Sequence, residues 1–214
     1  MSETLLLYSY WRSSSAYRVR IALNLKGIPH RIEPVHLLRN EQRREEYRRL
    51  NPSGLVPCLA DGDFALGQSL AIFNYLEAHT PEPSLVPVDP RAAARMWALC
   101  AIIACDTQPL QNLSVFQHLE TNCGLDQNAR DDWARHWIAR GLGAFEASLG
   151  EGPYCVGAPS FADCVLIPQL YNAGRYGLDP SQWPRLAAAA EAFEDLPEVA
   201  AAHPDRQPDT PSDS

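Results

Sequence analysis

Four prolines between Pro81 and Pro90 divide this 214-residue sequence into two stretches with different hydrophobic patterns. Before them, short apolar runs alternate with helix-length amphipathic segments, whereas after them only helical periodicity remains. The proline-rich stretch has no periodicity of its own, so we predict a linker there. The sequence therefore predicts an α/β domain over residues 1–82 and an all-α domain over residues 91–214.

The first stretch predicts the element order β-α-β-α-β-β-α, which is the pattern of a thioredoxin-like domain. Lys26-Gly27 is a helix stop signal, and Asp61-Gly62 is a strong hairpin turn signal. The predicted strands are Thr4–Tyr10, Arg31–Leu37, Val56–Ala60 and Phe64–Leu66, and the predicted helices are Ser14–Lys26, Asn40–Leu50 and Ser69–His79.

The second stretch is expected to contain helices alone. They are predicted over Arg91–Glu120, Asp126–Leu149, Phe161–Tyr176, Pro184–Leu196 and a short piece near Glu198–Ala202. Ser160 and Asp163 have the spacing of a capping box, which is a folding signal with no chemistry assigned to it. The tail Arg206–Ser214 is polar and rich in proline, so we expect it to be loosely held.

Composition excludes several classes of function. A formal net charge of −8 argues against binding to nucleic acid or to an anionic membrane. No apolar run approaches the roughly 20 residues of a membrane span, and the start does not resemble a signal peptide. The six cysteines include no CxxC pair, and the six histidines are scattered, so we expect reduced thiols, a cytoplasmic protein and no metal site.

Three serines follow the first predicted strand, where the first predicted helix begins. A serine at a helix start is usually an N-cap that accepts from a main-chain N–H group. Ser13, Ser14 and Ser15 exceed what one cap needs, however, and hydroxyls at the positive end of a helix can stabilise an anion. A thiol bound there would have a lowered pKa. The residues alone leave both interpretations open.

Two further segments have the character of ligand-binding loops. Pro57 opens a predicted strand and cannot donate to a sheet, so it belongs at an edge or a special turn. A cis Val56-Pro57 bond would expose the main chain of Val56 to an extended peptide. Gln68 and Ser69 begin another helix, whose N-terminus suits a carboxylate or needs only an ordinary cap.

Taken together, these motifs resemble the glutathione transferase family over nearly the whole chain. The general family pattern comprises Asn51-Pro52, Val56-Pro57, Gln68-Ser69 and Ser160-x-x-Asp163. A closer similarity to the zeta class lies in five motifs: Arg12-Ser13-Ser14 with Arg18-Val19-Arg20-Ile21-Ala22-Leu23, Gln108 to Ser114, Tyr154 to Gly157, Asn172-Ala173-x-Arg175, and His203 to Pro211.

The resemblance implies a glutathione transferase fold, glutathione as the cofactor and a cytoplasmic homodimer. It implies an isomerase that converts maleylacetoacetate, a dicarboxylate, to fumarylacetoacetate in tyrosine and phenylalanine catabolism. It also implies roles for single residues. Ser13, Ser14 and Ser15 would surround the sulfur, the main chain of Val56 beside Pro57 would pair with the cysteinyl unit, Gln68 and Ser69 would hold the γ-glutamyl end, and Gln42, Gln108, Asn112 and Ser114 would close the pocket. Arg12 and Arg175 are candidates for the substrate carboxylates, because arginine binds carboxylates through two parallel hydrogen bonds.

Other functions stay open from the sequence. Zeta enzymes usually have a cysteine where this chain has Ser15 and a serine where it has Ala16. Related maleylpyruvate isomerases have an arginine near the position of Leu113, and its absence here favours maleylacetoacetate. The alternatives are a maleylpyruvate isomerase, a zeta-type transferase acting on α-halo acids, or a non-catalytic binding module. The module hypothesis predicts loss of the serines or of Gln68-Ser69, and all of these are present.

Overall fold

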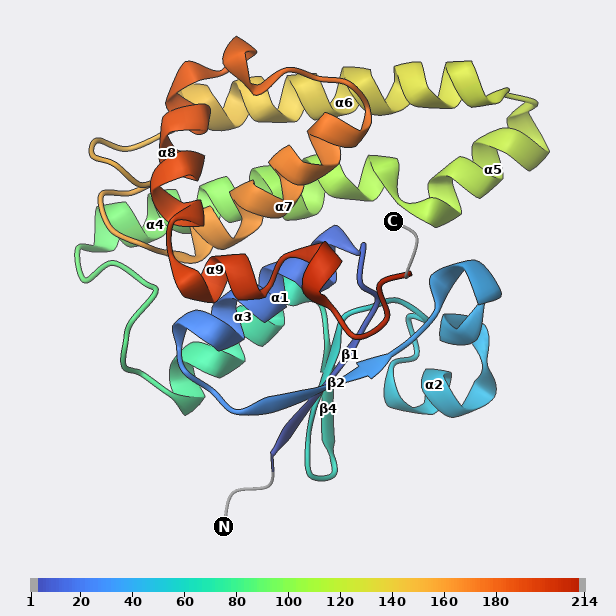
Figure 1. The fold of residues 1–214 in the computed structure, drawn as a ribbon, viewed down its shortest axis with the longest axis horizontal. Coiled ribbons are helices and arrows are strands. Elements are labelled where there is room, and N and C mark those ends of the chain that lie inside the picture. Colours follow the sequence, from blue (N-terminus) through green and yellow to red (C-terminus); the bar gives the residue numbers. More distant parts are fainter. Residues whose placement is uncertain (1–3, 212–214) are drawn as a thin grey trace. The chain divides into compact units, whose positions relative to one another are not determined.

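The computed structural model describes residues 4–211, which form two compact units (Figure 1). The first unit runs to Leu85 and takes up the chain again from Asp195, whereas the second comprises Val86–Glu194. The segment after Asp195, which the sequence pattern placed in the helical domain, therefore packs with the α/β unit. Among the described residues, no helix is long and apolar enough to cross a membrane.

A four-stranded sheet in the order β2-β1-β3-β4 organises the first unit and confirms the thioredoxin-like prediction. The strands are β1 (Leu5–Ser9), β2 (His30–Pro34), β3 (Cys58–Asp61) and β4 (Phe64–Gly67). β1 is parallel to β2 and antiparallel to β3, and β3 and β4 form the predicted hairpin. Gly62 has a φ of +59° at the hairpin turn, a conformation that glycine adopts without steric cost.

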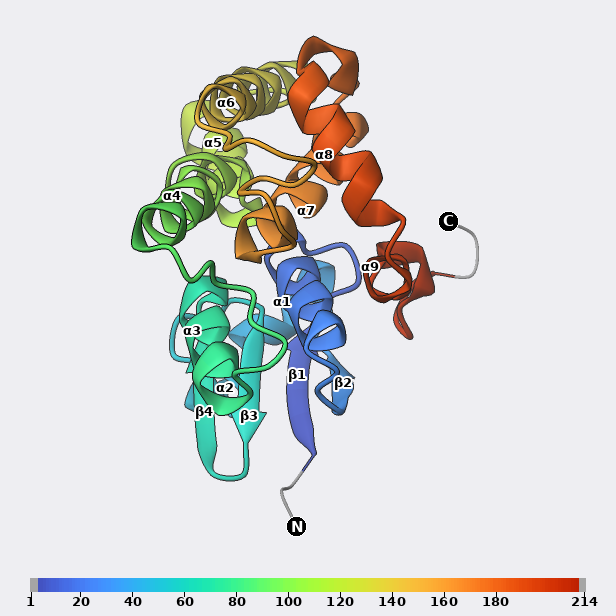
Figure 2. The same cartoon turned by 90° about the vertical axis from the view of Figure 1, so that its left-hand side faces the viewer.

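The helices of this unit are α1 (Ser14–Leu25), α2 (Glu45–Leu50), α3 (Ser69–His79) and α9 (Pro197–Ala201). α1 and α3 lie on one side of the sheet and α2 on the other (Figure 1), and Figure 2 views the sheet from the side of α1 and α3. α1 packs against both α3 and α9. On the other face, Tyr8 of β1 meets Tyr47 of α2 edge to face, with ring centroids 5.9 Å apart. Alternating residues of β1 thus face different helices, as a strand between two layers requires.

The predicted helix Asn40–Leu50 is only partly right. Asn40 has a φ of +55°, and Arg44 is extended, so two 3₁₀ turns precede the short helix α2. Asparagine tolerates the left-handed conformation better than most residues, which explains why the chain turns there.

The second unit contains only helices. They are α4 (Pro90–Ala101), α5 (Leu113–Cys123), α6 (Gln127–Ala147), α7 (Phe161–Arg175) and α8 (Pro184–Glu194), and the predictions for α6, α7 and α8 are confirmed within a few residues. The capping box at the start of α7 is also confirmed, since the Asp163 carboxylate accepts from the N–H group and the hydroxyl of Ser160.

The single helix predicted over Arg91–Glu120 is wrong. After α4 the chain forms a π-helical turn, Ile102–Thr107, and then a 3₁₀ turn, Gln108–Gln111, before α5 begins. Pro109 supplies no N–H group, and Asn112 has an extended backbone and caps α5. A π-helical turn inside a helical region often marks a functional site.

The prediction that the tail is loosely held is wrong for residues 206–211. Asp209 accepts a hydrogen bond from the main chain of Trp11, and Gln207 donates to two carbonyl groups upstream of it. Long-range contacts of this kind leave no local pattern in the sequence. Residues 212–214 of the predicted tail lie outside the described part of the chain.

Candidate active site

Three loops of the first unit emerge at the same end of the sheet. Tyr8 pairs with Cys58, and Cys58 pairs with Gly67, so the C-terminal end of β1, the start of β3 and the end of β4 lie in one row. Residues 10–13 leave β1, the Val56-Pro57 bond leads into β3, and Gln68 follows β4. The register therefore groups the motifs that the sequence singled out in this unit.

The start of α1 uses only one of its three serines as a cap. Ser13 is the N-cap, and its Oγ accepts from the N–H group of Ala16 at 3.3 Å. Ser14 and Ser15 lie in the first turn, half-buried like Ser13. The Ser14 hydroxyl makes no hydrogen bond within residues 4–211. The cap interpretation is thus correct for Ser13, and Ser14 keeps a hydroxyl that a ligand can use.

The loop that leads into β3 presents the main chain of Val56. The carbonyl oxygen of Leu55 accepts from Tyr47 Oη at 2.6 Å and from Asn51 Nδ2 at 2.7 Å. Val56 itself is buried, yet its N–H and C=O groups have no hydrogen-bond partner in the described chain. The Val56-Pro57 bond is cis. Because main-chain polar groups in buried residues are nearly always paired, the N–H and C=O groups of Val56 are available to a hydrogen-bonding ligand.

Gln68 and Ser69 differ in exposure and in their hydrogen bonds. Gln68 is exposed and has a φ of +68°, which a residue with a Cβ rarely adopts. Ser69 is buried, and its Oγ accepts from Arg18 Nη1 at 3.3 Å. Arg18 on α1 thereby fixes the start of α3, a role that sequence reasoning missed. Its only signal is a charged residue within the mostly apolar stretch Ala16–Leu23, which also contains Arg20.

Gln42 supports the presence of a ligand in a different way. It is buried, and its Oε1 has no hydrogen-bond partner in the described part of the structure. A Cβ at Gly54 would lie 3.1 Å from the carbonyl oxygen of Gln42, so glycine lets the two segments approach closely. An amide oxygen left unpaired in a buried position is costly, and a bound donor would satisfy it.

Arg12 is the cationic group closest in sequence to the serines. Its guanidinium lies 5.2 Å from the centroid of the Trp11 ring. Within residues 4–211 it has no carboxylate partner. The guanidinium is therefore available to an anionic ligand, and its role toward a substrate carboxylate stays a prediction.

The remaining predicted residues belong to the second unit. Gln108 begins the 3₁₀ turn before α5. Asn112 is the N-cap of α5, and its Oδ1 accepts from both the N–H group and the hydroxyl of Ser114. Asn112 and Ser114 thus bond to each other, which gives both a structural use besides the predicted contact with glutathione.

Arg175 is held by a chain of buried amides that the sequence analysis missed. Its Nη1 donates to Asn172 Oδ1 at 2.8 Å, and Asn172 Nδ2 donates in turn to Gln111 Oε1. Gln111 Nε2 then donates to Gln169 Oε1 at 3.3 Å. These hydrogen bonds connect the 3₁₀ turn to α7. They also hold Asn172, to which Arg175 donates. The available signal in the sequence was that the amide residues Gln111, Gln169 and Asn172 lie in largely apolar segments.

Cys58 is the thiol that lies in the row of paired strand residues. Burial raises its pKa to about 11. It therefore stays protonated at neutral pH, and a thiolate signal measured there would not come from Cys58. The described cysteines form no disulfide, and Cys105 and Cys123 are the exposed ones. No group of three or more potential metal ligands occurs in residues 4–211.

Comparisons with known proteins agree on one family. Residues 12–79 match the family described as "Glutathione S-transferase, N-terminal domain". The chain is 44% identical to a probable maleylacetoacetate isomerase of Vibrio cholerae, over 96% of this chain and 98% of the relative.

Two solved structures resemble the whole chain as well. One is the holo structure of a maleylpyruvate isomerase described as a bacterial glutathione S-transferase of the zeta class. It has a TM-score of 0.94 and 39% identity and covers 96% of this chain and 100% of its own. The other is a maleylacetoacetate isomerase from Methylobacterium extorquens with bound malonate and glutathione. It has a TM-score of 0.93 and 40% identity, with 97% and 100% covered.

Proposed function

This chain belongs to the zeta class of the glutathione S-transferases, and we propose that it is a glutathione-dependent isomerase that converts maleylacetoacetate to fumarylacetoacetate. The observation that carries the proposal is the unpaired main chain of buried Val56, which lies at the same sheet end as the start of α1 and Gln68. The named relatives support the reaction class.

The residues of the first unit fit glutathione. Val56 would pair with the cysteinyl main chain of the tripeptide, beside Pro57, and Gln68 and Ser69 would hold its γ-glutamyl end. Gln42 would use its unpaired Oε1 to accept from the ligand. When bound, glutathione supplies the thiolate nucleophile and is recovered unchanged. We propose that Gln108, Asn112 and Ser114 of the second unit complete its surroundings.

The start of α1 would provide most of the electrostatic stabilisation of the glutathione thiolate. Ser13 and Ser14 would donate their O–H groups to the sulfur, with Ser15 in a secondary role. A cap uses a lone pair of the Ser13 oxygen and leaves its proton available. The positive end of the helix adds to this and lowers the pKa of a bound thiol. Donors aimed at developing negative charge are typically the largest contribution to catalysis.

Two arginines are proposed to bind the substrate carboxylates. Arg12 has its guanidinium over Trp11 and no carboxylate partner in the described chain. Arg175 is held at Asn172 by the chain of amides. Malonate, a dicarboxylate, is bound together with glutathione in one of the similar structures, which supports an anionic substrate.

The decisive experiment is turnover of maleylacetoacetate with glutathione, without it, and with S-methylglutathione as the matched control. We expect activity with glutathione alone and an unchanged glutathione concentration after many turnovers. S-Methylglutathione keeps the peptide contacts but has no ionisable thiol, so it should bind and not support turnover. Activity without any thiol, or consumption of one glutathione for each product, would contradict the proposal.

Maleylpyruvate is the second candidate substrate, because one of the similar structures is a maleylpyruvate isomerase. The absence of an arginine near Leu113 favours maleylacetoacetate. We expect a higher kcat/KM for maleylacetoacetate than for maleylpyruvate or chloroacetate under identical conditions. The reverse order would reassign the substrate and leave the glutathione chemistry in place.

The family resemblance also supports proposals about the cellular context. The protein would be a cytoplasmic homodimer in tyrosine and phenylalanine catabolism. Light scattering measures the mass in solution, and a single protomer mass of 23.8 kDa would contradict the dimer. Complementation of a host strain that lacks its own isomerase, with tyrosine as the carbon source, tests the pathway.

A further inference from the structure

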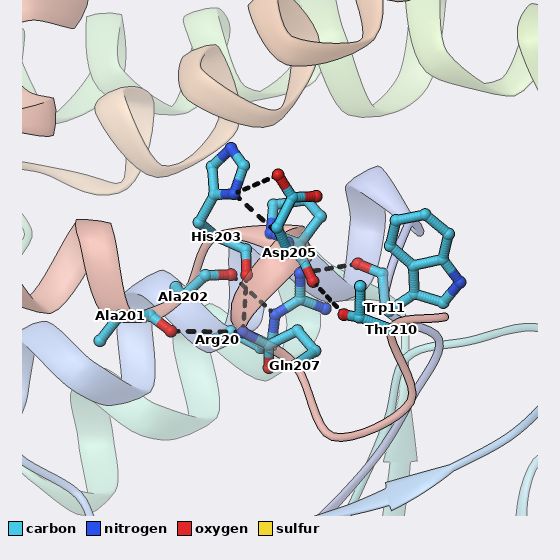
Figure 3. Close-up of polar contacts among 9 residues, drawn as sticks. Trp11, Arg20, Ala201, Ala202, His203, Asp205, Gln207 and Thr210 are labelled. Atoms are coloured by element: carbon cyan, nitrogen blue, oxygen red, sulfur yellow. Dashed lines mark hydrogen bonds and ion pairs between the residues drawn. The ribbon is translucent and has the colours of Figure 1, made fainter. Parts of the chain in front are cut away.

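The end of the described chain forms a braced segment, residues 203–210, which we name the C-terminal strap. Gln207 Nε2 donates to the carbonyl oxygen of His203 at 2.8 Å, and Thr210 Oγ1 donates to that of Pro204 at 2.6 Å (Figure 3). These internal bonds, together with the 3₁₀ turn Pro204–Arg206, hold the strap in one conformation.

The strap contacts the loop between β1 and α1 through a carboxylate. Asp209 Oδ2 accepts from the main-chain N–H group of Trp11 at 2.8 Å, across 198 positions of sequence. A hydrogen bond from an N–H group to an ionised carboxylate is roughly twice as strong as one between neutral groups. The orientation of the peptide unit that precedes Trp11 is thereby fixed from outside the loop.

Arg20 holds the same loop from α1. Its Nη2 donates to the carbonyl oxygen of Trp11 at 3.0 Å, its Nη1 donates to Ser9 Oγ at 3.1 Å, and its Nε donates to the carbonyl oxygen of Ala202 at 3.1 Å. Figure 3 shows the guanidinium between the main chains of Trp11 and Ala202. Arg20 is only 1% exposed, so these bonds are shielded from water.

Both polar main-chain groups of Trp11 are therefore occupied, the N–H group by Asp209 and the C=O group by Arg20. The next two residues are Arg12, proposed for a substrate carboxylate, and Ser13, the cap and proposed thiolate donor. A small rotation at Trp11 would move both of them. A misplacement of about 1 Å caused by a residue away from the chemistry can lower a rate by about a hundredfold.

We propose that Asp209 is a positioning residue, through which the C-terminal strap places the loop between β1 and α1 for ionisation of the bound thiol. The inference rests on the proposed use of a glutathione thiolate. It assigns the strap a role in catalysis besides its role in stability, and it requires no contact between Asp209 and either ligand.

The test compares Asp209→Ala with the matched control Asp205→Ala in the full-length protein. Asp205 is an exposed carboxylate of the same strap, whose side chain lies 3.6 Å from His203 and makes no hydrogen bond to the loop within residues 4–211. Three sets of quantities are measured. They are the pKa of the bound glutathione thiol from its ultraviolet thiolate absorbance, kcat with the KM values for glutathione and for maleylacetoacetate, and the melting temperature.

Asp209→Ala should raise the pKa of the bound thiol by about one unit and lower kcat by about ten- to a hundredfold. The glutathione KM should change little, because Val56 and Gln68 lie on other loops. Asp209→Asn keeps an oxygen that can accept from Trp11, so it should recover most of the wild-type pKa and kcat. Asp205→Ala should match the wild type in both quantities.

Two outcomes would overturn the inference. One is a lower melting temperature for Asp209→Ala with an unchanged thiol pKa and kcat, which would make the strap merely structural. The other is an equal shift in Asp205→Ala, which would make the effect one of net charge. The thiol pKa is measured without maleylacetoacetate, so it decides the role of Asp209 even if the physiological substrate is a different one.

Discussion

Gln68 holds a backbone conformation that is costly for a residue with a Cβ. With φ at +68° and ψ at 111°, it precedes α3 without capping it through its side chain. Such conformations cost about 1–3 kcal/mol and tend to cluster where function requires them. The proposed contact with the γ-glutamyl end of glutathione explains why an amide is kept there in place of glycine.

We therefore predict that Gln68→Gly and Gln68→Ala separate strain from binding. Both lose the amide, so calorimetry should find glutathione binding weakened about equally in both. Gln68→Gly should be more stable than Gln68→Ala by about 1 kcal/mol in urea denaturation, because glycine relieves the strain at positive φ. Unchanged glutathione affinity in both variants would contradict the placement of the γ-glutamyl end.

Ser13 combines two uses of one hydroxyl, and these can also be separated. Ser13→Ala removes the cap and should lower the free energy of unfolding by about 0.5–2 kcal/mol, whereas Ser13→Gly should cost only a few tenths. Both remove the O–H donor, so both should lower kcat, by about 100- to 1000-fold for a key donor. Ser14→Ala should lower kcat without a loss of stability.

Steady-state turnover, the ultraviolet thiolate absorbance of bound glutathione and urea denaturation of these serine variants supply the measurements. Ser15→Ala should have a mild effect, and Ser15→Cys should be tolerated because it restores the usual residue of the class. Full activity and an unchanged thiolate signal in Ser13→Gly would reduce Ser13 to a cap.

Residues with a local signal were the predictable ones. Ser13, Val56-Pro57 and Gln68-Ser69 all stand where an element begins, and the rules for such positions are local. Arg18 and Asn51 belong to the motifs quoted for the family, but their roles escaped prediction because each role depends on a partner. Arg18 donates to Ser69, which lies 51 positions away. Asn51 acts through the loop that it closes onto Leu55.

At the scale of elements, the largest difference between the predicted and the observed structure is the interruption between α4 and α5. The apolar pattern of residues 91–120 fits one helix, and periodicity cannot reveal a π-helical turn. The turn is stabilised by packing: Thr107 Oγ1 donates to the carbonyl oxygen of Ile102 at 2.6 Å, and a Cβ at Gly141 of α6 would collide with Thr107. Gly141 therefore permits the close approach of α6.

Gly141→Ala should consequently destabilise the protein, and Gly143→Ala is its control on the same helix. Alanine normally stabilises a helix interior by about 1 kcal/mol relative to glycine. That gain is expected at Gly143, where the nearest atom to an added Cβ is Trp183 Nε1 at 3.9 Å. At Gly141 the collision should outweigh it and cost about 1–3 kcal/mol. Equal urea midpoints for the two variants would show that α6 can shift.

At the scale of the whole molecule, two patterns separated by prolines were enough to predict an α/β part and a helical part. The return of the chain to the first unit was not predictable, because it depends on a buried arginine. Arg20 is embedded in a helix, and nothing in its neighbours indicates that its acceptors include Ala202 and the loop after β1. A polar, proline-rich sequence is typical of loose tails, and here the same residues form the strap.

The first unit should therefore depend on a segment that lies beyond the second unit in sequence. A chain ending at Glu194 would lose the acceptor of Arg20 Nε at Ala202 and the partner of Trp11 at Asp209. It would also uncover the face of α1 that packs against α9. A buried polar group left without its partner costs about 1–3 kcal/mol, more if it is charged. We expect the loss of several such contacts to unfold the first unit locally.

Hydrogen exchange measures this directly, since amides of β1 should lose protection while those of α6 and α7 keep theirs. A chain ending at Pro211 is the control, because it retains every described contact of the strap. Adding residues 195–211 as a separate peptide should restore part of the protection in β1, with a dependence on peptide concentration that reports its affinity. Full protection of β1 in the chain ending at Glu194 would mean that the sheet with α1, α2 and α3 suffices, and that the Arg20 guanidinium is satisfied without Ala202.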